Sequence, residues 1–183
     1  MNEELDLLKR VAQKLEKAGI SYMMTGSMAL AIYAVPRMTR DIDIIIEASS
    51  EDALRIVDLF KDDFYIDPDS VQNAIRHKGM FNIIHNESVI KVDFIVRKDG
   101  DFRIEEFSRK KNMNIEGVRV SFVTAEDLIL SKLVWAKRTD SELQLRDVRQ
   151  ILNSVKDIDT TYLDKWAKEL GVLDILSKAN EHE

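Results

Sequence analysis

The sequence predicts an α+β protein, because strand-like and helix-like stretches are mixed up to residue 123 and only helix-like stretches follow. Segments rich in β-branched residues read as strands, since these side chains pack well on a pleated sheet. Apolar residues at helical spacing read as amphipathic helices. No Pro-, Gly- or Ser-rich linker divides the chain. We therefore expect an α+β core, 1–123, on which a helical region, 124–183, packs to form one compact unit.

The first quarter of the chain predicts two helices and two strands. Apolar residues recur at helical spacing over 3–18, and Gly19 then ends this helix. A short strand over 20–25 is broken by a Gly-Ser step, and the small and apolar residues 27–34 predict a buried helix. The isoleucine-rich stretch 41–47 predicts the next strand.

The later elements follow from the same patterns. A hairpin is predicted where two strand-like stretches, 80–86 and 89–96, meet at a turn-forming Asn-Glu-Ser sequence. Thr124 opens the helical region with a sequence of the capping-box type. The other expected elements are a strand at 118–123 and helices at 51–61, 70–77, 128–138, 141–155 and 161–170.

Composition excludes several classes of protein. The net charge of -6 argues against sequence-independent binding of DNA or RNA, which depends on rows of Lys and Arg. The absence of cysteine excludes disulfides, Cys-based zinc sites and thiol nucleophiles. No apolar stretch near the N-terminus is long enough for a signal peptide or a membrane span. We therefore expect a cytoplasmic protein that does not associate with a membrane.

Two aspartates on the isoleucine-rich strand are the first candidate site residues. Side chains alternate along a strand, so Asp41 and Asp43 share one face while the isoleucines take the other. Neighbouring carboxylates repel one another, and a cation that neutralises them keeps both ionised. A lone Asp at the start of a strand is commonly a turn cap or a solvated charge, so the pair by itself is weak evidence for a metal site.

A third aspartate strengthens this interpretation. Asp93 stands in the middle of the strand 89–96 and opposes its apolar face, although Asp is disfavoured inside strands. If this strand lies beside 41–47, Asp93 faces Asp41 and Asp43. Three carboxylates without nearby His or Cys favour Mg²⁺ or Mn²⁺ over zinc, so these residues are predicted metal ligands.

The Gly-Ser step provides a place for a phosphate. A glycine at a strand-to-helix turn lets the backbone approach a ligand, and the free amides at a helix start attract anions, so Gly26 and Ser27 are candidate phosphate-binding residues. Arg37 and Arg40 flank the following loop and suit bidentate recognition of phosphate. The alternatives are an ordinary turn with an N-cap and solvated arginines.

Other catalytic and nucleotide-binding motifs are absent. The sequence has neither the Gly-x-x-x-x-Gly-Lys-Ser/Thr phosphate loop nor the Gly-x-Gly-x-x-Gly dinucleotide motif. The three histidines show no metal-ligand spacing and no recognisable triad order. The acids and the Gly-Ser step therefore carry the functional prediction.

These residues resemble the nucleotidyltransferase superfamily. The matching stretches are TGSMALAIY (25–33), RMTRDIDIII (37–46) and VDFIV (92–96), which bring a Gly-Ser step, an Asp-x-Asp pair and a third acid in the family's order. The Arg-x-Thr-x-Asp-x-Asp arrangement is similar to that of the AbiEii-type abortive-infection and type IV toxin nucleotidyltransferases of bacteria. The resemblance implies an α+β fold with a small mixed sheet flanked by helices, a C-terminal helical bundle, an NTP, two metal ions and a partner antitoxin protein.

The AbiEii-type group also carries a Lys on one later helix and a Lys-Asp or Arg-Asp step on the next. Lys132 and Asp147 match these positions, and each falls in an apolar column of its predicted helix. The resemblance implies that Lys132 acts near the nucleotide phosphates or the acceptor and that Asp147 orients it. A buried structural ion pair between two helices is the alternative.

The predicted activity is the transfer of an NMP from an NTP to an acceptor hydroxyl. Asp41 and Asp43 would hold Mg²⁺ or Mn²⁺, Gly26 and Ser27 with a nearby arginine would hold the triphosphate, and Asp93 would activate or orient the hydroxyl. The acceptor classes left open are an RNA end, a protein and a small molecule. One alternative is a non-catalytic module of the same fold that binds a nucleotide or a protein. Another is a purely structural ion-pair sheet in which Lys91 neutralises the acids.

Overall fold

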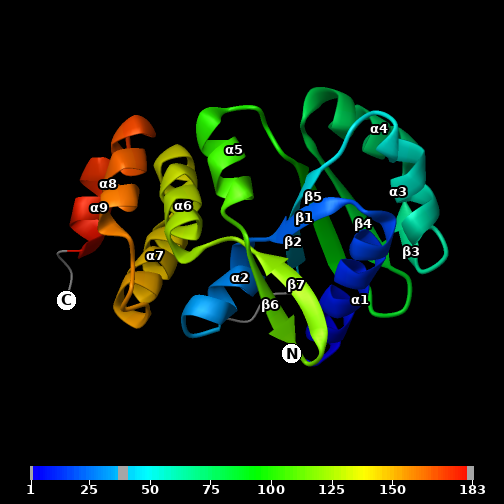
Figure 1. Cartoon of the computed structure of the whole chain (residues 1–183), viewed down its shortest axis with the longest axis horizontal. Coiled ribbons are helices and arrows are strands. Elements are labelled where there is room, and N and C mark those ends of the chain that lie inside the picture. The colour runs from blue at the N-terminus through cyan, green and yellow to red at the C-terminus, as the bar shows by residue number, and fades with distance from the viewer. Residues whose placement is uncertain (1, 37–40, 181–183) are drawn as a thin grey trace.

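The computed structural model describes residues 2–36 and 41–180, and within these it has one seven-stranded mixed sheet and nine helices (Figure 1). The strands are β1 (Ser21–Met24), β2 (Asp41–Glu47), β3 (Phe64–Ile66), β4 (Met80–His85), β5 (Lys91–Val96), β6 (Lys111–Ile115) and β7 (Val118–Phe122). The helices are α1 (Asn2–Ala18), α2 (Gly26–Tyr33), α3 (Asp52–Phe60), α4 (Pro68–His77), α5 (Asp101–Ser108), α6 (Ala125–Thr139), α7 (Glu142–Ser154), α8 (Thr160–Glu169) and α9 (Leu173–Asn180).

The strand order is β3-β4-β5-β2-β1-β7-β6, which places β2 at the centre of the sheet. β2 runs parallel to β5 and antiparallel to β1. The predicted hairpin is confirmed, since β4 and β5 pair antiparallel with Phe81 opposite Phe94. The predicted α+β class is confirmed as well. Because the two acids belong to the central strand, they have neighbouring strands on both sides.

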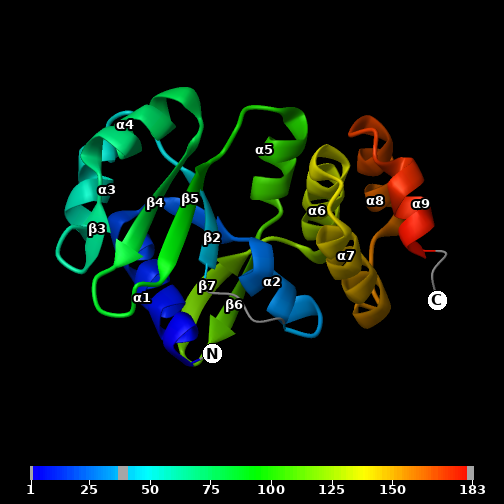
Figure 2. The same cartoon turned by 180° about the vertical axis from the view of Figure 1, so that it is seen from behind.

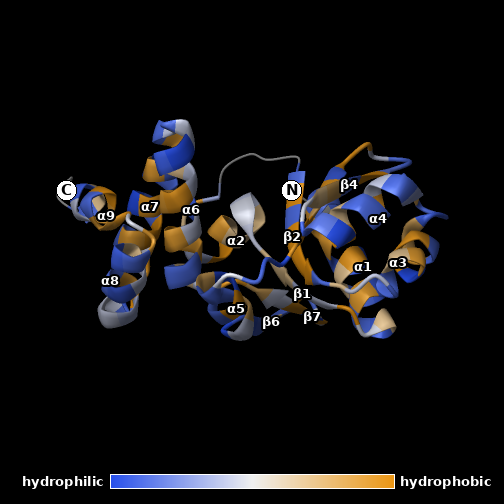
Figure 3. Ribbon diagram, turned by 90° about the horizontal axis from the view of Figure 1, so that it is seen from above, coloured by the Kyte–Doolittle hydropathy of each residue, from blue (hydrophilic) through white to orange (hydrophobic). Residues whose placement is uncertain are grey.

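The two faces of the sheet carry different helices. Figure 3 shows α1, α3 and α4 on one side of β2 and α2 on the other. The isoleucines Ile42, Ile44 and Ile46 are at most 1% exposed and belong to the main hydrophobic core. A strand whose alternate residues are fully buried must keep its register, because a shift by one residue would expose the whole apolar set. This packing therefore holds the acids of β2 on the opposite face.

The C-terminal helices α6 to α9 gather at one end of the molecule (Figure 2). α6 contacts α7 and α8, while α7 contacts α9 and α2. The capping prediction at Thr124 is confirmed, because its side chain accepts a hydrogen bond of 3.3 Å from the backbone N–H of Asp127. Within the described ranges, no helix is both long and apolar enough to cross a membrane.

Four elements were not predicted individually, namely β3, β6, α5 and α9, although a helical region was expected to the end of the chain. β3 has three residues, and β6 is an edge strand with a mostly polar sequence, so neither produces a clear hydrophobic pattern. α5 is an eight-residue helix that buries Phe102, Glu106 and Phe107. One of these buried residues is charged, and the apolar spacing therefore does not reveal the helix.

Candidate active site

Asp41 and Asp43 lie on β2 and point away from its buried isoleucines. The side chain of Asp41 is 53% exposed, whereas Asp43 is half-buried. The alternation expected from the sequence is therefore present. Two of the predicted site residues, Arg37 and Arg40, belong to the segment 37–40 and lie outside the described residues.

Asp93 lies directly beside Asp43. The parallel pairing of β2 and β5 sets Asp43 opposite Asp93 and Asp41 opposite Lys91. Side chains opposite each other on neighbouring strands point to the same face, so the three acids and Lys91 share one surface of the sheet. Asp93 is only 7% exposed. The adjacency on which the metal-site prediction depended is thus present in the fold.

Gly26 packs directly against the Asp43 side chain. Its backbone has a φ of +63°, and a Cβ at this position would stand 2.0 Å from Asp43 Oδ2 and 2.7 Å from its Cγ. The preceding residue, Thr25, donates its backbone N–H to the carbonyl oxygen of Asp43 at 2.9 Å. Only glycine fits here, because any side chain would both strain the backbone and displace the carboxylate.

The start of α2 lies against the face of the sheet that carries Asp41, Asp43 and Asp93, because Gly26 packs on Asp43. Ser27 occupies the first turn of α2 and is buried, at 7% exposure. Thr25 is the N-cap residue of α2, but its side chain makes no capping hydrogen bond. The first N–H groups of a helix have no partner within the helix, and they attract anions. A phosphate at this helix start would lie close to Asp43.

Lys91 neutralises part of the acidic face. Its Nζ lies 2.7 Å from Asp93 Oδ2 and 3.8 Å from Asp41 Oδ2. Burial raises the pKa of the Asp43 carboxyl, and the carboxylates of Asp93 and Asp41 raise it further. The positive charges of Lys91 and Lys132 act in the opposite direction. The net shift of the Asp43 pKa is upward, and burial is its largest cause.

Lys132 and Asp147 form a buried pair that reaches toward this face. Lys132 Nζ donates to Asp147 Oδ2 at 2.7 Å and to Gln144 Oε1 at 3.1 Å. Lys132 is 5% exposed and Asp147 is 1% exposed. The predicted ion pair between α6 and α7 is therefore present. Because the Lys132 charge also acts on Asp43, Lys132 links the helical region electrostatically to the acids.

Two polar residues of this region were not predicted. Asn82 on β4 is opposite Asp93, and it is exposed on the same face of the sheet. Its position between two apolar residues of a strand is a signal that the sequence does contain. Gln144 is a second acceptor for the Lys132 ammonium. It begins no recognisable motif, so only the packing of α6 on α7 reveals it.

The acids fit a divalent cation by the chemistry of their donor atoms. Asp93 Oδ1 is buried and accepts no hydrogen bond from any described residue. A buried oxygen without a donor is costly, and a cation relieves that cost. Carboxylate oxygens are the ligands that Mg²⁺ and Mn²⁺ prefer. In the geometry described for 2–36 and 41–180, no three His, Cys, Asp or Glu side chains converge closely enough to form a metal site.

Several solved structures are similar to this chain in fold. The antigenic nucleotidyltransferase-like protein from Paracoccidioides brasiliensis has a TM-score of 0.58 at 18% identity, with 99% of this chain and 94% of that chain covered. The antibiotic-resistance factor ANT(2'')-Ia has a TM-score of 0.62 at 12% identity, covering 100% and 99% of the two chains. The lincosamide antibiotic adenylyltransferase LnuA, with lincomycin bound, has a TM-score of 0.57 at 11% identity over 85% and 98%.

These similarities at low identity establish the fold, and the family follows from a sequence comparison. No curated protein matches the chain. A family profile matches residues 4–170, which include the acids of β2 and β5, the Gly-Ser step and the Lys132–Asp147 pair. The predicted superfamily and the predicted enzyme class are thereby confirmed. The chain belongs to the family described as nucleotidyl transferase of unknown function (DUF2204).

Proposed function

We propose that this protein is a metal-dependent nucleotidyltransferase that moves an NMP from an NTP to an acceptor hydroxyl. The observation that carries the proposal is the register of the central strands, which sets Asp43 beside Asp93 directly under Gly26. Membership of a nucleotidyl transferase family supports the reaction class. The metal, the roles of the residues and the acceptor are our inference from the chemistry of this face.

Different residues of the chain would bind the triphosphate and hold the metal ions. Gly26 and Ser27, with Arg37 or Arg40, would hold the triphosphate near the start of α2. When bound, two Mg²⁺ or Mn²⁺ ions held by Asp41, Asp43 and Asp93 would supply charge neutralisation to the attacking and leaving oxygens. The acceptor oxygen forms a bond to the α-phosphorus as the bond from that phosphorus to the bridging oxygen breaks, and pyrophosphate leaves.

The remaining roles concern the proton and the orientation of the acceptor. Asp93 would take up the proton of the attacking hydroxyl, because its buried Oδ1 accepts no hydrogen bond from any residue that the structure describes. Lys132 would attract the negatively charged phosphates, while Asp147 and Gln144 hold its ammonium in place. Catalysis in this scheme comes from positioning and electrostatic stabilisation, without a covalent enzyme intermediate.

Similar folds guide the choice of acceptor. LnuA is described as a lincosamide adenylyltransferase, and ANT(2'')-Ia has been solved in complex with adenylyl-2''-tobramycin. These small-molecule acceptors are described for LnuA and ANT(2'')-Ia, and not for this chain. For this chain we propose an acceptor hydroxyl on a small molecule, with an RNA end or a protein as the other outcomes of the test. The net charge of -6 argues against a large nucleic acid as the acceptor.

We also carry forward the narrower AbiEii-type resemblance as a proposal. It rests on Arg37, Thr39, Asp41 and Asp43 as an Arg-x-Thr-x-Asp-x-Asp sequence, followed by Lys132 and Asp147 on later helices. Under this proposal the protein is a cytoplasmic toxin that a partner antitoxin protein restrains. Co-purification of a neighbouring gene product that blocks nucleotidyl transfer would support it.

The direct test is transfer of label from each α-labelled NTP with Mg²⁺ or Mn²⁺, with and without cell extract. We expect Asp43→Asn and Asp93→Asn each to lower transfer by about 100-fold or more, since each removes charge stabilisation at the reacting centre. Asp62→Asn, at an exposed position beyond α3, is the matched control and should keep full activity.

The other outcomes separate the alternatives. Metal-dependent nucleotide binding without transfer to any acceptor would favour a non-catalytic binding module. If the wild type neither binds nucleotide nor transfers label, the proposed function is wrong. A purely structural role for the acids would then be tested by Lys91→Met, which leaves Asp93 buried without its ammonium partner. This variant should have a lower free energy of unfolding than the wild type.

A further inference from the structure

A second polar site lies where the sheet opens between β1 and β7. These two parallel strands are in register only at Met24 and Phe122, so they separate toward their starting residues. A cavity of about 250 Å³ occupies this opening, and its lining includes the end of α1 and parts of β1, β6 and β7. The three acids of the active-site face are not part of its lining. The cavity begins beside Ser21, at the opposite end of β1 from Gly26.

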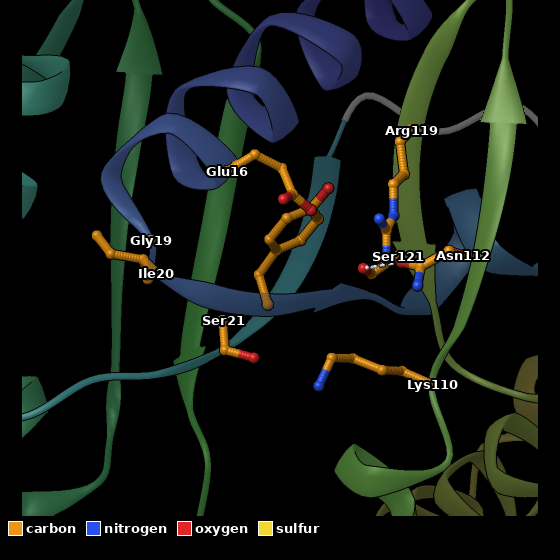
Figure 4. Close-up of a pocket in the computed structure, with 9 residues that line it drawn as sticks. Glu16, Gly19, Ile20, Ser21, Lys110, Asn112, Arg119 and Ser121 are labelled. Carbon is orange, nitrogen blue, oxygen red and sulfur yellow. Dashed lines mark hydrogen bonds between the residues drawn. The ribbon is translucent and has the colours of Figure 1, made fainter.

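The lining of this cavity is rich in hydrogen-bond donors. Figure 4 shows Lys110 and Ser21 pointing toward one another across it and Arg119 extending along β7 toward Ser121. Ser121 donates its hydroxyl to Asn112 Oδ1 at 2.7 Å. The Asn112 amide nitrogen is thereby oriented as a donor, because its oxygen is already engaged.

The charges in the cavity are only partly balanced. Lys110 and Arg119 line the cavity together with one carboxylate, that of Glu16, which is exposed at the end of α1. Glu47, outside the lining, also acts on the Lys110 charge. Within the part of the chain that the structure describes, neither cation forms an ion pair. Lys110 Nζ donates to the carbonyl oxygen of Phe107 at 3.2 Å and lies 4.0 Å from the centre of that ring. The lining of the cavity therefore carries a net positive charge, on a chain whose own net charge is -6.

From these observations we propose that the cavity binds a small anion through a phosphate or carboxylate group, held by Lys110, Arg119 and Asn112. Arginine suits such groups because its guanidinium donates two parallel hydrogen bonds. The volume is below that of sites for drug-sized ligands, so an ion or a short metabolite fits and a nucleotide does not. This site is separate from the NTP site and does not depend on the proposed transfer reaction.

The test is titration of the whole chain with two probes, inorganic phosphate and succinate, each followed by amide NMR and calorimetry without NTP. We expect saturable shifts of the Ser21, Asn112 and Arg119 amides with at least one probe. The two titrations distinguish a phosphate ligand from a carboxylate ligand. Arg119→Gln and Lys110→Gln should each weaken binding about tenfold, as expected for loss of one charge-assisted hydrogen bond at a partly exposed site.

Two controls separate this site from general charge effects and from the candidate active site. Arg76→Gln removes an exposed cation from α4 and should leave binding unchanged. Ser27→Ala alters the start of α2 and should also leave it unchanged. The proposal is wrong if neither probe gives saturable shifts, or if binding survives both cation substitutions. It is equally wrong if the shifts centre on Gly26 and disappear in Ser27→Ala.

Discussion

Replacement of Gly26 by alanine tests the central contact of the site. Gly26 has a φ of +63°, a conformation that costs alanine about 1 kcal/mol. The added methyl would also stand 2.0 Å from Asp43 Oδ2, 2.7 Å from Cγ and 2.9 Å from Cβ. Turning the carboxylate away relieves the first two contacts but not the third, so the strand must also shift. We assign about 1–2 kcal/mol to this rearrangement.

Gly19 provides a matched control for the backbone cost. Its φ is +67°, and a Cβ there meets no atom within 4 Å. Gly19→Ala should therefore cost only the backbone strain, about 1 kcal/mol, while Gly26→Ala should cost about 2–3 kcal/mol. Urea unfolding of both variants at equilibrium measures the free energies of unfolding. The difference between them isolates the contact with Asp43.

A double variant extends this test. Asp43→Ala removes the two atoms that clash most, so Gly26→Ala should cost less in that background, by about 1 kcal/mol. In the wild-type background, Gly26→Ala should also lower label transfer about 100-fold, because it displaces a carboxylate by the order of an ångström. If Gly26→Ala is no more destabilising than Gly19→Ala, the proposed packing of the glycine on the carboxylate is refuted.

Three further predictions concern the buried polar groups of the helical region. Lys132→Met should cost about 3–5 kcal/mol in the free energy of unfolding, since it removes the buried ammonium that lies 2.7 Å from the Asp147 carboxylate. Adding Asp147→Leu should recover most of that cost, and equal costs for the single and the double variant would contradict this. Tyr162→Phe should cost about 1–3 kcal/mol, because Tyr162 donates at 2.6 Å to a buried carboxylate of α6, while Tyr65→Phe, at an exposed position, should cost nothing measurable by urea unfolding. Burial raises the pKa of Glu106 above its ordinary 4.5, so the native state retains a proton that the unfolded state has lost, and stability falls as the pH rises from 4.5 through the raised pKa. Urea midpoints across this range should therefore fall more steeply for the wild type than for Glu106→Gln, and parallel curves would show that Glu106 has no such effect.

The central strand shows how much of the candidate site can be predicted from the sequence. Alternation along 41–47 separates the isoleucines from Asp41 and Asp43, because strand side chains point to opposite faces in turn. The strand character of 91–96 and the position of Asp93 within it are equally local. The sequence does not determine which strands are neighbours in the sheet. Pairing of β2 with β5 joins segments about fifty residues apart, and no local pattern specifies that register.

Other features depend wholly on packing. The contact between Gly26 and Asp43 depends on the pairing of β1 with β2, and the cavity beside Ser21 depends on the divergence of β1 and β7. The polar edge strand β6 and the short helix α5 lack a clear apolar periodicity, so their structure follows from what they pack against.

The sequence by itself determined the class of fold, the faces of the main strands, the helical end of the chain and the residue types of the candidate site. Each of these follows from periodicity, propensity or motif, which are properties of neighbouring residues. The tertiary structure decided that Asp43 and Asp93 are adjacent, that Lys91 partly neutralises them and that Lys132 acts on Asp43 from α6. It alone decides these points because they depend on distances between residues far apart in the chain.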